Sequence, residues 1–166
     1  KMKEDLLVAG LDVFAKYRLL GLGNDLPDSN AEEPGIQAAI QNLHDNGIFE
    51  LMIRDEYKHL RLQLGKLLIE YAEGNLRHDL LQQAQSLAIS TIRLLENSEF
   101  KKEMADAYNL LGRIYQCYSD SDNLLRAIKC FKRSSEILEE INLKKLAAVD
   151  HQNISGIYVR LHEWFK

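Results

Sequence analysis

The chain has 166 residues, of which 46% are hydrophobic and 28% charged, so it can bury one sizeable core as a single domain or as a piece of a larger protein. A formal net charge of -4 argues against direct nucleic-acid binding, since such domains display a concentrated basic face. The only two prolines, Pro27 and Pro34, lie in one short acidic segment, which leaves the rest of the chain free to be helical. We therefore expect an all-α chain.

The cysteines and the apolar segments indicate the cellular compartment in which the protein is expected. Cys117 and Cys130 are well separated and form no CxxC motif, so neither a disulfide framework nor a metal site is predicted. The apolar stretch at residues 6–11 is interrupted by charges far short of a membrane span. These patterns favour a reduced, cytoplasmic protein without a membrane span.

Residues 1–60 are expected to form N-terminal helices around an acidic loop at residues 21–35. Apolar residues at helical spacing predict helices at 4–20, 36–45 and 48–73. Gly21 and the pair Asn46-Gly47 are the stop signals between them. This part shows no internal repeat, so we interpret it as a capping unit or a divergent repeat.

Residues 61–166 are predicted to contain most of the remaining helical structure, with further helices at 76–96, 100–118, 122–140 and 144–163. Gly74-Asn75 is expected to end the preceding helix, and Asn97-Ser98 to separate the next two. The count is then about seven helices, and their short connections predict antiparallel neighbours. A compact orthogonal bundle is the alternative arrangement.

Repeated motifs lie within this second part. The run Tyr108–Tyr115, followed by Ala127–Phe131, resembles the tetratricopeptide repeat (TPR), with Leu111-Gly112 as its Leu-Gly pair. Weaker copies surround Leu64-Gly65 and Ile154-Ser155. The resemblance implies a long-helix α-solenoid of stacked antiparallel helix pairs, in which the glycine and alanine positions allow two helices to approach closely. The last repeat lacks its second helix, so the chain is expected to be a fragment.

In the family that the chain resembles, the inner face of each first helix contacts the ligand. The resemblance therefore implies a partner-binding set made of amides and long cations: Lys66, Asn109, Arg113, Gln116, Gln152, Asn153 and Arg160. Asn and Gln suit the backbone of an extended peptide, while Lys and Arg suit its carboxylates. The alternative is that these are ordinary exposed residues of amphipathic helices.

No catalytic or metal-binding constellation is predicted, and no cofactor. The five histidines show no i, i+4 pair, and Ser134-Ser135 are interpreted as small packing residues at a helix crossing. We expect a non-enzymatic protein–protein interaction scaffold that binds a peptide or partner helix on its concave face. The alternative is a ligand- or peptide-sensing regulatory domain of a larger transcriptional or signalling regulator.

The C-terminal helix carries an apolar stripe that has no partner helix in the sequence. Its members are Tyr158, Leu161, Trp164 and Phe165. Because covering such a stripe is favourable, we expect the C-terminal helix to form a homo-oligomer or to bury these residues in a contact with another chain.

Overall fold

The computed structural model describes residues 58–164, and the side chains of residues 58–162. All regular structure in this range is helical, which confirms the all-α expectation for this part of the chain. The helices are α4 (Lys58–Arg77), α5 (Leu81–Leu95), α6 (Lys101–Tyr118), α7 (Ser121–Glu140) and α8 (Lys144–Trp164). The expected helices at 4–20 and 36–45, the acidic loop at 21–35 and the start of helix 48–73 lie outside the described residues. The total of seven helices therefore stays a prediction.

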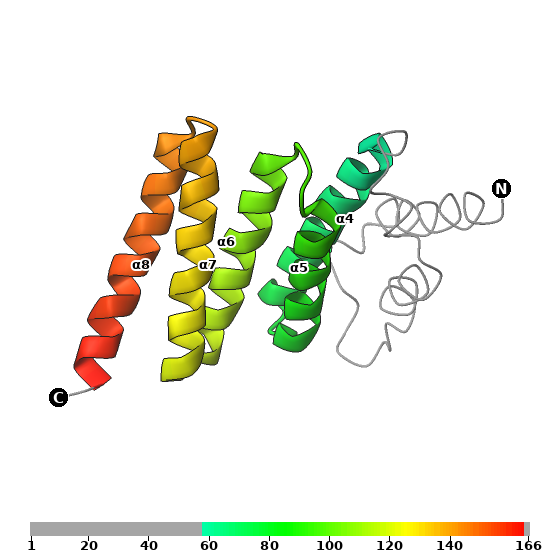
Figure 1. The fold of residues 1–166 in the computed structure, drawn as a ribbon. Coiled ribbons are helices and arrows are strands. Elements are labelled where there is room, and N and C mark those ends of the chain that lie inside the picture. Colours follow the sequence, from blue (N-terminus) through cyan, green and yellow to red (C-terminus); the bar gives the residue numbers. More distant parts are fainter. Residues whose placement is uncertain (1–57, 165–166) are drawn as a thin grey trace.

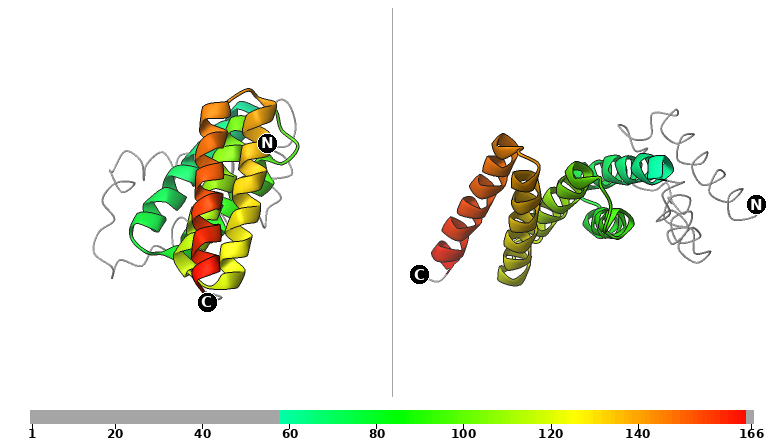
Figure 2. Two further views of the ribbon diagram at one scale, coloured as in Figure 1. Left: turned by 90° about the vertical axis from the view of Figure 1, so that its left-hand side faces the viewer. Right: turned by 45° about the horizontal axis from the view of Figure 1, so that its top comes forward.

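Consecutive helices run in alternate directions and follow one another in chain order from α4 to α8 (Figure 1). Each helix packs against the next one, and α4 also packs against α6. The turned views show α8 lying alongside α7 at one end of the described part, with α4 and α5 at the other end (Figure 2). One side of α8 is consequently free of any described helix.

The predicted boundaries of α6, α7 and α8 agree with the structure to within one residue. The predicted end of α4 at Gly74-Asn75 is wrong. The helix continues to Arg77, with Gly74 and Asn75 buried inside it. The chain turns instead at Asp79, whose φ is 58°, and α5 begins at Leu81 rather than near residue 76.

Each of the four connections contains one residue with a left-handed backbone conformation. These residues are Asp79, Asn97, Ser119 and Asn142, with φ between 58° and 63°. Short polar side chains tolerate this region better than other non-glycine residues, because they form local hydrogen bonds. The start of α7 is capped by Asp120, whose Oδ1 accepts a hydrogen bond of 2.9 Å from the backbone N–H of Asn123. The short connections thus use polar residues to reverse the chain.

Two glycines lie at close helix contacts within the core. A Cβ added at Gly112 on α6 would lie 2.9 Å from ring carbons of Phe131 on α7. A Cβ added at Gly65 on α4 would lie 3.1 Å from the side chain of Leu95 on α5. Phe131 and Leu95 are both fully buried, so each helix pair is closed over a glycine. The predicted close approach of the helices at Gly112 is confirmed.

The C-terminal helix corrects one expectation. Leu161 was predicted to belong to an uncovered apolar stripe, but it is only 8% exposed and belongs to the core with Ile154 and Ile157. Tyr158, by contrast, is 51% exposed. The side chains of Trp164 and Phe165 lie outside the described residues. The prediction was wrong at Leu161 because the side of α8 that carries this residue packs against the core.

Candidate partner-binding surfaces

The seven predicted binding residues lie on three alternate helices, α4, α6 and α8. Lys66 is on α4; Asn109, Arg113 and Gln116 are on α6; Gln152, Asn153 and Arg160 are on α8. We call the surface that carries these seven side chains the α4/α6/α8 face. Four of the seven residues already contact another part of the chain, as described below.

Two ion pairs connect α4 with α6 on this face. Lys66 Nζ lies 3.5 Å from Glu103 Oε1, and Arg113 Nη1 lies 3.4 Å from Glu73 Oε1. Both cations are exposed, and an exposed ion pair contributes only about 0–1 kcal/mol to stability. A ligand carboxylate can therefore replace Glu103 or Glu73 at small cost in fold stability.

Asn109 is engaged in a buried polar contact between α6 and α8. Its Nδ2 donates a hydrogen bond of 2.6 Å to Oδ1 of Asp150, which is 0% exposed. The other carboxylate oxygen of Asp150 and the buried Ser134 hydroxyl make no hydrogen bond of good geometry. Burial raises the pKa of the Asp150 carboxyl, and the nearby Ser134 hydroxyl and the Asn109 amide oppose this shift in part. Asn109 therefore holds two helices together, a role that the sequence analysis missed.

Asp150 could have been noticed from the sequence. It stands among the residues that pack α8 into the molecule, with Ala147 before it and Ile154 after it. A carboxylate at such a position is unusual, because burial of an unpaired charge is costly. The neighbours Ser134 and Ser135 are buried, as predicted for packing residues at a helix crossing.

Gln116 is half-buried near the end of α6, and the other three predicted residues lie along one side of α8. Gln152 is exposed, Asn153 is half-buried, and Arg160 Nη2 donates a hydrogen bond of 3.2 Å to the Ser119 hydroxyl. At helical spacing from Gln152 and Asn153 stand two exposed apolar residues, Val149 at 48% and Val159 at 60%. Amide and apolar groups therefore alternate along the outside of this helix.

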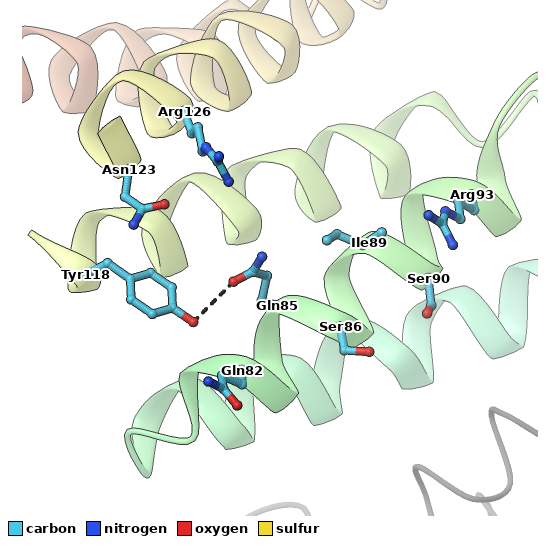
Figure 3. Close-up of a pocket in the computed structure, with 9 residues that line it drawn as sticks. All are labelled: Gln82, Gln85, Ser86, Ile89, Ser90, Arg93, Tyr118, Asn123 and Arg126. Carbon is cyan, nitrogen blue, oxygen red and sulfur yellow. Dashed lines mark hydrogen bonds between the residues drawn. The ribbon is translucent and has the colours of Figure 1, made fainter. Parts of the chain in front are cut away.

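A second surface, absent from the sequence-based set, lies between α5 and α7 above the end of α6. This groove has a volume of about 640 Å³. Figure 3 shows its lining: Gln82, Gln85, Ser86, Ile89, Ser90 and Arg93 from α5, Tyr118 from α6, and Asn123 and Arg126 from α7. We call it the α5/α7 groove. The lining residues of α5 recur at helical spacing and are mostly polar, so this stripe is recognisable in the sequence. Which residues of α6 and α7 lie beside it is decided by the packing of the helices.

Three helices orient side chains into one end of this groove. The Tyr118 hydroxyl donates a hydrogen bond of 3.1 Å to Oε1 of Gln85, and Arg126 extends toward the same region (Figure 3). The Arg126 guanidinium also lies 5.9 Å from the centre of the Tyr115 ring, at the distance of a cation–π contact. Neither Arg126 nor Arg93 forms an ion pair within the described part of the chain.

Between residues 58 and 162 no three His, Cys, Asp or Glu side chains are placed to hold a metal ion together. None of the five described helices is long and apolar enough to cross a membrane. The two cysteines are unbridged, with Cys117 exposed and Cys130 buried.

Comparison with protein-family models, with curated proteins and with solved structures gave no match for this chain. Its assignment to a function therefore depends on the geometry above.

Proposed function

We propose that the chain is a protein–protein interaction module in which TPR-like helix pairs present the α4/α6/α8 face to a peptide or a partner helix. The pairs in this proposal are α4/α5 and α6/α7, and α8 is the first helix of a third pair. In this proposal the chain binds its partner without catalysing a reaction, through the side chains that the face exposes.

The proposal of paired repeats is supported by the recurrence of one contact. In α4/α5 the glycine of a Leu-Gly pair meets Leu95, and in α6/α7 the glycine of the next Leu-Gly pair meets Phe131. A repeat architecture also requires first helices to contact each other, and α4 packs against α6 in this way. A glycine on the first helix thus contacts a large buried side chain on the second helix in both pairs.

The observation that carries the binding proposal is the chemistry of the exposed strip on α8. Gln152 and Asn153 can accept and donate hydrogen bonds to a peptide backbone, and Val149 and Val159 can cover apolar side chains. On the adjacent α6, Arg113 supplies a cation whose intramolecular ion pair is exposed and weak. Together these groups match the needs of an extended peptide that carries both apolar and acidic residues.

The proposal is tested by affinity capture with the whole chain and with two charge-reversed variants. Lys66→Glu with Arg113→Glu changes the α4/α6/α8 face, while Lys132→Glu with Lys144→Glu makes the same charge change at exposed positions elsewhere on α7 and α8. Proteins retained by the wild-type chain and by the Lys132/Lys144 variant, but lost from the Lys66/Arg113 variant, support the proposal. Equal retention by all three chains contradicts it, provided that their melting temperatures agree.

We also propose that two copies of the chain associate through α8. The contact surface differs from the one expected from the sequence, because Leu161 is buried. This proposal is supported by the exposure of the neighbouring residues Tyr158 and Val159, and by the open space around Gly156, where an added Cβ would have nothing within 4 Å. A second copy of α8 would remove these apolar side chains from water.

A further inference from the structure

We propose that the α5/α7 groove binds an extended acidic peptide, as a second binding surface separate from the α4/α6/α8 face. The proposal is independent of the function proposed above, because the two surfaces share no residue.

The charge of the groove is the first argument. Among the described residues, its lining includes two arginines, Arg93 and Arg126, and no carboxylate. The cations of the α4/α6/α8 face differ in this respect, because Lys66 and Arg113 each have a glutamate within 4 Å. Arg93 and Arg126 have no ion-pair partner among residues 58–162, in a chain whose net charge is -4, so the groove is a local site for carboxylates.

The neutral side chains are the second argument, because they suit a peptide backbone. The Tyr118 hydroxyl donates to the carbonyl oxygen of the Gln85 side chain, which leaves the Gln85 NH₂ group to donate toward the groove. Gln82 and Asn123 add two more amides that can both donate and accept. Such groups pair with the alternating N–H and C=O groups of an extended chain.

The dimensions of the groove set the length of the peptide. The stripe on α5 from Gln82 to Arg93 covers about 16 Å at roughly 1.5 Å per residue. An extended peptide advances about 3.3 Å per residue, so about five residues fit along it. Because Arg126 lies at the Gln85 end and Arg93 at the far end of the stripe, we expect two carboxylates separated by several residues to bind best (Figure 3).

A nucleic acid fits this groove less well than a peptide. Single strands are bound through aromatic side chains on which bases stack, together with a long basic track along the backbone. Tyr118 is the one aromatic side chain among the described residues of the lining, and it is held by its hydrogen bond to Gln85. Two arginines also make too short a track for several phosphates.

The experiment uses fluorescence polarisation with fluorescein-labelled heptapeptides. One panel carries two Glu residues at every separation from one to five positions, and a matched panel carries Gln in their place. We expect the Glu panel to bind, with one separation preferred and with affinity that falls as salt is added. Arg93→Gln with Arg126→Gln should weaken the best peptide at least tenfold, because both positions are exposed and the fold should be retained.

The control variant is Lys66→Glu with Arg113→Glu, which should leave the affinity of this peptide unchanged within about twofold. A loss confined to the Lys66/Arg113 variant would assign the acidic peptide to the α4/α6/α8 face and overturn the proposal. Equal binding of the Gln panel, or no binding of either panel, would also overturn it. A labelled single-stranded oligonucleotide that bound as tightly, and lost affinity in the Arg93/Arg126 variant, would replace the peptide by a nucleic acid.

Discussion

Gly112 lies against the ring of Phe131, so closely that a methyl group at Gly112 would stand 2.9 Å from two ring carbons. Phe131 is fully buried and cannot move outward without opening the contact between α6 and α7. The glycine is therefore required by the neighbouring helix, even though glycine inside a helix costs roughly 0.5–1 kcal/mol relative to alanine.

Substitution of Gly112 should destabilise the fold. For Gly112→Ala we expect a loss of about 1–3 kcal/mol in the free energy of unfolding, since the ring of Phe131 has to be displaced. Gly65→Ala should cost less, because its neighbour is the flexible end of Leu95, 3.1 Å away. Urea unfolding followed by circular dichroism measures these differences.

The matched control for these two changes is Gly156→Ala. Gly156 is exposed on α8, and nothing lies within 4 Å of its added Cβ. This substitution should leave stability unchanged or raise it by up to about 1 kcal/mol through better helix propensity. A Gly112→Ala variant as stable as Gly156→Ala would remove Gly112 from the close contact.

Asp150 should make the stability of the protein depend on pH in a particular direction. Because burial raises the pKa of its carboxyl in the folded state, the charged form is disfavoured there, and the contribution of Asp150 to stability increases as the pH falls through the folded pKa. Asp150→Asn has no charge to bury and can keep the hydrogen bond from Asn109. The advantage of this variant over the wild type should therefore be largest near neutral pH and shrink on acidification.

This difference is measured by denaturant unfolding of both chains at several pH values from neutral to about 4. Comparing the two chains cancels the other titrating groups, among them Asp120, whose pKa is lowered by the hydrogen bond from the Asn123 backbone. A wild-type advantage that grows with pH would mean that the folded state stabilises the charged carboxylate.

The two cysteines should react at very different rates. Cys117 is exposed, whereas burial raises the pKa of the Cys130 thiol to about 12. Since the thiolate is the reactive form, an aromatic disulfide reagent should label one thiol per native chain and two in denaturant. Cys117→Ser should abolish the native reaction. Rapid labelling of Cys130 in the folded Cys117→Ser chain would contradict the packing of α7.

The exposed side of α8 should support self-association. Sedimentation of the chain over a range of concentrations should show a larger species, and Val159→Glu should return it to a monomer, because a charge would have to be buried in the contact. Val159 is 60% exposed, so the substitution should leave the fold intact. A wild-type chain that stays monomeric at high concentration would exclude this contact.

The sequence was sufficient for the helices whose apolar pattern and stop signals agree. The boundaries of α6, α7 and α8 were predicted closely, because short polar turns separate these helices in the sequence. It was insufficient at Gly74, where a residue typical of helix ends is buried within α4. Local propensity favours an end there, but packing against neighbouring residues keeps the helix intact and moves the turn to Asp79.

By itself, the sequence determined the helical class and the residue types that could face a partner, since both follow from spacing along one chain. Only the tertiary structure decided what those residues do. Asn109 is hydrogen-bonded to Asp150, and Lys66 and Arg113 are paired with glutamates. Within the described part of the chain, Arg93 and Arg126 have no carboxylate partner. The physical reason is that hydrogen bonds and ion pairs depend on distances between helices, whereas helical periodicity only assigns each side chain to one face of its own helix.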